Sequence, residues 1–279
     1  MRINLLCEIA GVTRSGYYQW LKRADSPSKD NGDYLLIKEL FDRGRGKYGH
    51  RTIQMKLASD LGIVMNHKKI LRIMREHGLL AKVRRRNPYK NIAKKTEEHR
   101  SCENILAGNF KQRQPFKFLC TDITYLPNRG GLAYLSAVKD IATREIVGWC
   151  LSRQIGMELV LETIASLKEN AGARNEKLTD ALIHSDQGFH YTNPLYIFQI
   201  KSLAMTQSMS RKGNCLDNAP MESFFGHFKD EVDYAECRTF GELKRLVSEH
   251  IEYYNNRRYQ WELKKMTPAE YRNHLLNPS

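Results

Sequence analysis

The spacing of apolar and polar positions divides the chain into a helical first part and a second part that mixes strands and helices. Between residues 34 and 75, apolar residues recur at helical spacing in three short segments separated by glycines. In the last segment Ile70, Ile73 and Met74 mark one face of a helix, with Asn66 as its N-cap and Gly78 as its stop. This pattern is typical of a helix-turn-helix, although a generic three-helix bundle shows it as well.

From residue 116 onward the pattern changes to short runs of aliphatic and aromatic residues. It predicts strands over residues 116–126, 132–138 and 145–151, which suggest an antiparallel meander. The elements expected after them are a helix over 156–170, a strand over 181–186, a helix over 194–203, a strand over 204–209 and a helix over 219–232. This order indicates an α/β fold with a mixed five-stranded sheet and flanking helices, preceded by a small all-α region.

Positive charge is concentrated in the first hundred residues. They hold 23 basic and 10 acidic side chains, whereas residues 101–279 hold 22 and 21, within a total net charge of +14. A polyanion such as nucleic acid is the expected partner, and a merely basic soluble surface is the alternative. A charge run in isolation is usually a solvated face, but the basic run after Gly78 is interpreted as an arm that contacts phosphates. The candidate DNA-binding residues of this part are Lys68, Lys69, Arg72, Arg84, Arg85 and Arg86.

Composition and length predict the domain organisation and the cellular location. The chain has 279 residues, 41% of them hydrophobic, with no apolar run long enough for a membrane span or a secretory signal. Its six cysteines contain no CxxC pair, which agrees with reduced thiols and a cytoplasmic location. The expected divisions are a helical DNA-binding region over 1–80, a basic linker over 81–110, a core over 111–235 and a helical C-terminal tail over 236–279.

Three carboxylates fall at unusual places in this layout. Asp122 lies inside the first strand between apolar residues, Asp186 ends the fourth strand, and Glu222 lies early in the last helix. If the first and fourth strands are neighbours and the last helix packs across their ends, the three acids converge. Oxygen ligands of this kind would hold a hard cation such as Mg²⁺. Each acid also has a structural interpretation, as a turn former, an Asx turn or a first-turn acid of a helix.

The spacing of these acids is similar to that of a known superfamily. Asp186 and Glu222 have 35 residues between them. The segments around the three acids, Cys120–Tyr125, His184–Gly188 and Asn218–Phe225, resemble the three motifs of the D, D, 35, E transposases and retroviral integrases. More narrowly, the segments Ser208–Ala219, Tyr254–Arg258 and Thr267–Tyr271 resemble the OrfB transposase of the third insertion-sequence family of bacteria. The resemblance covers nearly the whole chain.

That resemblance implies an RNase H-like integrase catalytic core with a helix-turn-helix region before it. Asp122, Asp186 and Glu222 would be the catalytic residues and the ligands of two Mg²⁺ ions, for which Mn²⁺ may substitute. The implied activity is nicking at the 3′ ends of an insertion sequence followed by strand transfer. The implied DNA partner is double-stranded and comprises the terminal inverted repeats and the target DNA. The implied protein partners are further copies of the chain, in a homo-oligomeric synaptic complex, and an upstream OrfA partner or fusion. The implied location is the bacterial cytoplasm, on the nucleoid when DNA is bound.

Basic residues near the third motif are further candidates. Lys229 lies seven residues after Glu222 on the same helix and could hold a terminal phosphate, with an exposed lysine as the alternative. Arg211 and Lys212 precede a Gly-Asn turn in a loop expected to close over DNA. His184 is expected to be a packed histidine rather than a ligand. The chain departs from the family pattern at Leu216, where a tryptophan is expected.

Two other functions stay open from the sequence. The first is a DNA-binding regulator with a catalytically silent core, and the second is an RNase H-type nuclease that hydrolyses RNA in hybrids. The presence of all three acids disfavours the first, and the basic helical N-terminal part disfavours the second. A covalent tyrosine recombinase has little support, because no arginine-rich constellation surrounds a tyrosine.

Overall fold

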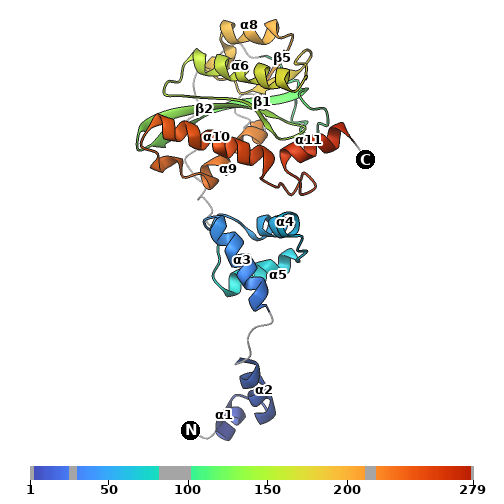
Figure 1. Ribbon diagram of the computed structural model, residues 1–279, viewed down its shortest axis with the longest axis vertical. Helices are drawn as coiled ribbons and strands as arrows, with labels where there is room; N and C mark the ends of the chain where they lie inside the picture. Colours follow the sequence, from blue (N-terminus) through green and yellow to red (C-terminus); the bar gives the residue numbers. More distant parts are fainter. Residues whose placement is uncertain (1–2, 25–29, 82–101, 211–217, 278–279) are drawn as a thin grey trace. The chain divides into compact units, whose positions relative to one another are not determined.

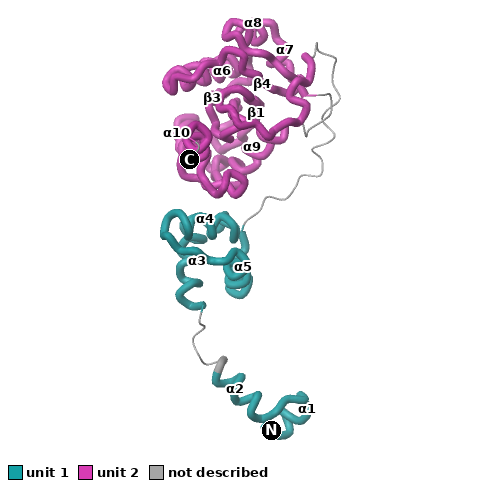
Figure 2. The backbone as a smooth tube through the Cα atoms, turned by 90° about the vertical axis from the view of Figure 1, so that its right-hand side faces the viewer, with its two compact units in different colours: residues 1–82 teal, residues 83–279 magenta. Residues whose placement is uncertain are grey.

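The computed structural model describes residues 3–24, 30–81, 102–210 and 218–277, which form two compact units, residues 1–82 and 83–279 (Figure 2). The candidate residues Arg84, Arg85, Arg86, Arg211 and Lys212 lie outside the described residues. Within the described ranges, none of the helices has both the length and the apolar content that crossing a bilayer requires.

All the regular elements that the structure describes in the first unit are helices. Its helices are α1 (Ile3–Ile9), α2 (Arg14–Ala24), α3 (Asn31–Arg43), α4 (His50–Leu61) and α5 (His67–Glu76). Helices α3, α4 and α5 share a core that includes Ile37, Ile53 and Ile70, each of which is completely buried. The Asn66 side chain accepts a hydrogen bond from the backbone N–H of Lys68 at 2.8 Å, so the predicted N-cap is confirmed.

The second unit is built on a five-stranded mixed sheet. Strands β1 (Phe118–Asn128), β2 (Gly131–Asp140) and β3 (Ile146–Ser152) form the predicted antiparallel meander, with a tight turn at residues 129–130. Strands β4 (Leu182–Ser185) and β5 (Thr206–Met209) run parallel to β1, and the strand order is β3-β2-β1-β4-β5. The first and fourth strands are therefore neighbours, as the convergence of the acids requires.

Helices cover both faces of this sheet (Figure 1). Helices α6 (Met157–Ala173) and α8 (Pro194–Ser202) lie on one face, and α9 (Ala219–Glu231) and α10 (Phe240–Asn256) lie on the other. The short helix α7 (Phe189–Thr192), the 3₁₀ turn η3 (Tyr234–Glu236) and helix α11 (Pro268–Leu276) complete the unit. Successive strand residues alternate between the two cores: Leu119 packs with the α6 side and Cys120 with the α9 side. Burial of both faces explains why β2 and β3 have largely apolar sequences.

Segments on either side of the expected core also belong to this unit. Leu106, which falls in the expected linker over 81–110, is buried in the same apolar cluster as β1 and α9. The backbone N–H groups of Ile105 and Leu106 both donate to the Ser208 hydroxyl on β5. Helix α10, within the expected tail over 236–279, buries Leu243 and Val247 in that cluster. These residues therefore help to hold the sheet that carries the candidate site.

Candidate active site

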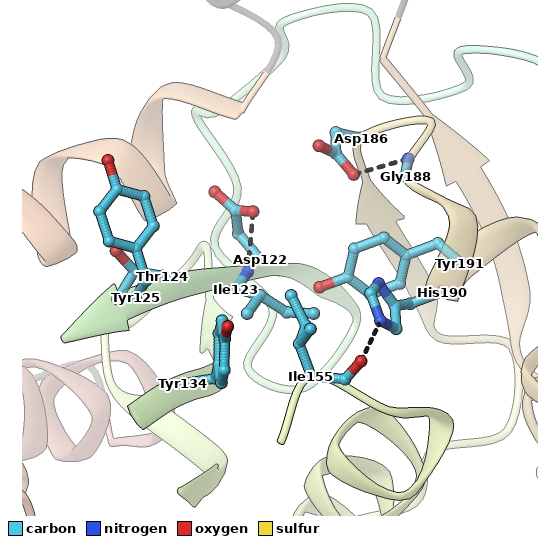
Figure 3. Close-up of a pocket in the computed structure, with 10 residues that line it drawn as sticks. All are labelled: Asp122, Ile123, Thr124, Tyr125, Tyr134, Ile155, Asp186, Gly188, His190 and Tyr191. Atoms are coloured by element: carbon cyan, nitrogen blue, oxygen red, sulfur yellow. Dashed lines mark hydrogen bonds between the residues drawn. The ribbon is translucent and has the colours of Figure 1, made fainter. Parts of the chain in front are cut away.

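A cavity of about 150 Å³ opens at the end of β4, beside β1 (Figure 3). It is lined by Asp122, Ile123, Thr124, Tyr125, Tyr134, Ile155, Asp186, Gly188, His190 and Tyr191. Two of the three predicted carboxylates thus share one cavity.

The parallel pairing of β1 with β4 explains why Asp122 and Asp186 meet. The register places Cys120 of β1 opposite His184 of β4, and each aspartate lies two residues further along its own segment. Residues two apart in a strand point to the same face, so the register that joins Cys120 and His184 also brings the two carboxylates together. A shift by one residue would turn one of them to the other face.

Each of these carboxylates is fixed by a hydrogen bond from the backbone. Asp186 Oδ1 accepts from the N–H of Gly188 at 2.9 Å, and Asp122 Oδ1 accepts from the N–H of Ile123 at 2.8 Å. The first bond is the Asx turn that the sequence suggested as a structural role, and the same residue also lines the cavity. A Cβ atom on Gly188 would lie only 2.8 Å from Asp186 Oδ1, so any larger residue here would displace that carboxylate.

Glu222 lies in the first turn of α9, as predicted, but is exposed and does not line the cavity. Over the described ranges, which omit residues 211–217 just before α9, no three His, Cys, Asp or Glu side chains are grouped closely enough to hold a metal ion. The structure therefore brings together Asp122 and Asp186 and leaves Glu222 apart from them.

Two buried side chains fix the start of α9 on the sheet. Asn218 Nδ2 donates to the backbone carbonyl of Thr121 at 3.3 Å, next to Asp122. The ammonium of Lys139, which is only 4% exposed, donates to the carbonyl of Pro220 at 3.1 Å. Lys139 is not among the residues predicted from the sequence. The signal for it is a charged residue near the end of a strand that is otherwise mostly apolar, where an unpaired buried charge would be costly.

Lys229 of α9 contacts Tyr125, one of the residues that line the cavity. The Lys229 ammonium lies 4.7 Å from the centroid of the Tyr125 ring, and Tyr125, which lines the cavity, is 64% exposed. A cation over an aromatic face is attracted by the quadrupole of the ring. This contact keeps a positive charge at the rim of a cavity that otherwise contains two carboxylates.

Tyr191 forms part of the cavity wall below the carboxylates. Burial raises the pKa of its phenol well above the ordinary value, and the negative charges of Asp122 and Asp186 act in the same direction. A hydrogen bond with the Thr121 side chain acts in the opposite direction, by a smaller amount. His184, by contrast, is completely buried with Nδ1 2.9 Å from the Ser208 hydroxyl, which confirms the expected packed histidine.

The basic residues predicted on α5 differ in their surroundings. Lys69 forms ion pairs with Asp30, at 3.0 Å, and with Asp33. Arg72 pairs with Asp30 at 2.5 Å and with Glu76 at 2.9 Å. Lys68 is exposed, and within the part of the chain that the structure describes no ion pair involves it. The hydrogen bond from Arg72, followed by that from Lys69, lowers the pKa of Asp30, so this acid stays ionised and offsets their charge.

Comparison with known proteins places the chain in a family. A model described as an HTH-like domain matches residues 28–87, and two described as an integrase core domain match residues 112–215 and 222–276. The putative transposase InsK of insertion sequence element IS150 from Escherichia coli K12 is 36% identical, with 99% of this chain and 95% of the relative covered. The transposase InsF of insertion sequence IS3A from the same strain is 29% identical, with coverages of 98% and 95%.

Solved structures that resemble the chain include two from T-cell lymphotropic viruses. The HTLV-2 integrase catalytic core domain in complex with magnesium is 13% identical, with a TM-score of 0.45, and covers 57% of this chain and 97% of its own. The simian T-cell lymphotropic virus intasome has a TM-score of 0.47 at 14% identity, with coverages of 78% and 74%. The identity to InsK over almost the full length, with all three family models in order, shows that the chain belongs to the IS3 family of insertion-sequence transposases with an integrase core.

Proposed function

We propose that this chain is a DNA transposase that nicks the ends of its insertion sequence and joins the resulting 3′ ends to DNA. The observation that carries this proposal is the pair of carboxylates, Asp122 and Asp186, on neighbouring parallel strands at one cavity. The anchored start of α9 beside Asp122 supports Glu222 as the third acid. The family relationship supports the same activity, since the relatives are named as transposases.

The donor set of the cavity fits Mg²⁺, or Mn²⁺ in its place. Asp122 and Asp186 offer carboxylate oxygens, which hard divalent cations prefer, and the cavity has no soft sulfur ligand among its lining residues. We assign Asp122, Asp186 and Glu222 as the residues that would hold two such ions. Such cations, when bound, would activate the attacking oxygen and stabilise the charge on the leaving 3′-oxygen. Three clustered carboxylates repel one another, so Glu222 is expected to join the other two only when cations offset that repulsion.

The chain's own residues then have distinct tasks. Asp122 and Asp186 are held in place by backbone N–H groups, so they provide a fixed frame for the reacting phosphate. Water is the nucleophile in the nicking step, and the freed 3′-hydroxyl is the nucleophile in the joining step. Because water and the 3′-hydroxyl are the nucleophiles, the proposed reaction proceeds without a covalent link between protein and DNA.

Binding of double-stranded DNA is proposed for both units. In the second unit, Lys229 at the rim of the cavity is the proposed contact to the phosphate of the terminal nucleotide. In the first unit, exposed Lys68 is the main proposed contact of α5, whereas acids already offset the charges of Lys69 and Arg72. Arg84, Arg85, Arg86, Arg211 and Lys212 remain proposed contacts on sequence grounds. Because two terminal inverted repeats must meet target DNA, we also propose a homo-oligomer in the synaptic complex, and an upstream OrfA partner or fusion.

The proposal is tested with duplex oligonucleotides that carry the inverted repeats flanking the gene, in Mg²⁺ and in Mn²⁺. Asp122→Asn, Asp186→Asn and Glu222→Gln are each expected to abolish nicking and joining and to leave duplex binding intact. Glu158→Gln is the matched control for Glu222, because Glu158 is likewise an exposed acid in the first turn of a helix. Asp180→Asn, at an exposed loop position, is the control for the aspartates.

Three outcomes separate the candidate functions. Strand transfer that survives in any one of the three variants would contradict the catalytic assignment. Binding without cleavage by the wild-type protein would favour a silent DNA-binding regulator. Hydrolysis of RNA in an RNA–DNA hybrid without joined products would favour an RNase H-type nuclease.

A further inference from the structure

The Tyr254–Arg258 segment, one of the sequence motifs outside the three acids, contacts helix α9. Arg258 Nε donates to both carboxylate oxygens of Glu231, the last residue of α9, at 2.9 and 3.0 Å, and Nη2 donates to Oε1 at 2.6 Å. The two side chains are only 17% and 20% exposed. A planar guanidinium that grips a carboxylate in this fork geometry fixes the orientation of its partner as well as the distance. The bond therefore ties the C-terminal end of α9 to the chain just after α10.

Both members of this ion pair are charged at neutral pH. Burial would raise the pKa of Glu231, but the positive charge and the hydrogen bonds of Arg258 outweigh burial, so the pKa of Glu231 is lowered. A buried ion pair contributes little net stability compared with apolar side chains of similar volume, because both charges lose their hydration. A role in geometry therefore explains this pair better than a role in stability.

Tyr254 connects the contacts at the two ends of α9. Its ring is 1% exposed and packs edge-on against that of Phe224 in α9, with centroids 5.0 Å apart. The Lys139 ammonium and the Arg258 guanidinium each lie 5.8 Å from the centroid of the Tyr254 ring. Because Lys139 donates to the Pro220 carbonyl at the start of α9, one ring contacts the cations that hold both ends of the helix.

Asn255 anchors the same segment to the sheet. Its side-chain amide donates to the backbone carbonyl of Ile146 and accepts from the N–H of that residue, both at 2.9 Å. Ile146 is the first residue of β3, a strand at the edge of the sheet. Since Asn255 is fixed on the sheet, the residues on either side of it hold α9 in a defined place relative to the sheet that carries the carboxylates.

We propose that Arg258 is a positioning residue, which acts through Glu231 to hold α9 where Glu222 can reach the carboxylate cavity. This inference rests on the proposed transposase function and adds to it a residue outside the three acids. Glu222 lies between the two anchored ends of α9. With both ends held, only the Glu222 side chain has to move when cations bind. A displacement of the helix approaching 1 Å would cost up to about 10²-fold in rate.

The first test compares Arg258→Lys with Arg272→Lys in the full chain. Lysine keeps the charge and loses the fork. Arg272 is a matched control, because it is 21% exposed and donates to the buried Glu145 at 2.8 Å, but it lies in α11, and Glu145 also pairs with Arg174. Corrected for the folded fraction, nicking in Mg²⁺ should fall by about 10- to 100-fold for Arg258→Lys and by less than about 3-fold for Arg272→Lys. Equal corrected rates would overturn the proposal.

The double variant Glu231→Met/Arg258→Met separates geometry from stability. Replacing both members of a buried ion pair by apolar side chains is often neutral or stabilising, whereas removing one member leaves a buried charge. The double variant should therefore unfold near the wild-type temperature and still nick about 10- to 100-fold more slowly. Nicking that recovers together with the unfolding temperature would overturn the proposal. If the double variant does not fold, the corrected rate of Arg258→Lys decides.

Failure of the underlying function looks different, since the wild-type protein would then not cleave at all. Amide hydrogen exchange of residues 219–231, measured without DNA and metal, then decides whether Arg258 holds α9. Exchange about 10-fold faster in Arg258→Lys than in Arg272→Lys supports the proposal, and equal exchange overturns it.

Discussion

Gly188, two residues after Asp186, provides a test of how strongly the position of the Asp186 carboxylate controls activity. A Cβ at Gly188 would lie 2.8 Å from Asp186 Oδ1, against an ordinary contact of about 3.5 Å, so Gly188→Ala must move the carboxylate by roughly 0.7 Å. The backbone itself tolerates alanine, because Gly188 has φ −63° and ψ 150°. The strain therefore acts on the Asp186 side chain and on its 2.9 Å bond to the Gly188 N–H.

The expected result follows from that displacement. Loss of the Asp186 hydrogen bond should lower the free energy of unfolding by about 1 to 2 kcal/mol. A misplacement approaching 1 Å at a reacting centre costs up to about 10²-fold in rate, so nicking should fall by about 10- to 100-fold. The assay is single-turnover cleavage of an end duplex in Mg²⁺, with thermal unfolding measured in parallel.

Gly156→Ala is the matched control for this change. Gly156 is likewise a glycine at a helix N-cap with negative φ, and a Cβ there would meet nothing within 4 Å. The control should therefore cleave at the wild-type rate. If Gly188→Ala and Gly156→Ala cleave equally fast, the position of the Asp186 carboxylate does not limit the reaction and the reasoning is refuted.

Three further predictions test other parts of the molecule. Lys139→Met leaves the half-buried Pro220 carbonyl without its donor, so the free energy of unfolding should fall by about 1 to 3 kcal/mol. Cleavage should fall further than the unfolded fraction explains, and cleavage that follows stability alone would contradict a role of Lys139 in placing α9. Lys68→Ala should reduce the slope of log affinity for DNA against log salt by about 1, whereas Lys69→Ala should change it less, because Asp30 and Asp33 already offset its charge; equal slopes would contradict this ranking. Burial raises the pKa of Asp140 to about 6, so its contribution to stability is full below its ordinary pKa and is lost as pH rises through about 6. Relative to Asp140→Asn, the wild-type unfolding free energy should fall by about 1 kcal/mol between pH 5 and pH 7.5, and a difference that does not change with pH would refute this.

Local periodicity predicted the elements of the second unit well. Strands expected over 116–126 and 181–186 form as Phe118–Asn128 and Leu182–Ser185, and the helix expected over 219–232 forms as Ala219–Glu231. These agreements arise because alternation and helical spacing report directly which side chains face a core. Motif spacing similarly selected Asp122 and Asp186, which the fold places at one cavity. By contrast, no described contact yet joins Glu222 to them, so its role stays a prediction.

Contacts between distant segments were beyond the reach of the sequence. Asp30 lies 42 residues before Arg72, and nothing in the pattern around α5 showed that this acid would offset its charge. No motif marked Tyr191 or Lys139, and only packing showed that one lines the cavity and the other anchors α9. The sequence by itself determined the elements, the family and the candidate acids, because those depend on local spacing. The tertiary structure decided which side chains share a site, because strand register and helix packing join residues far apart in the chain.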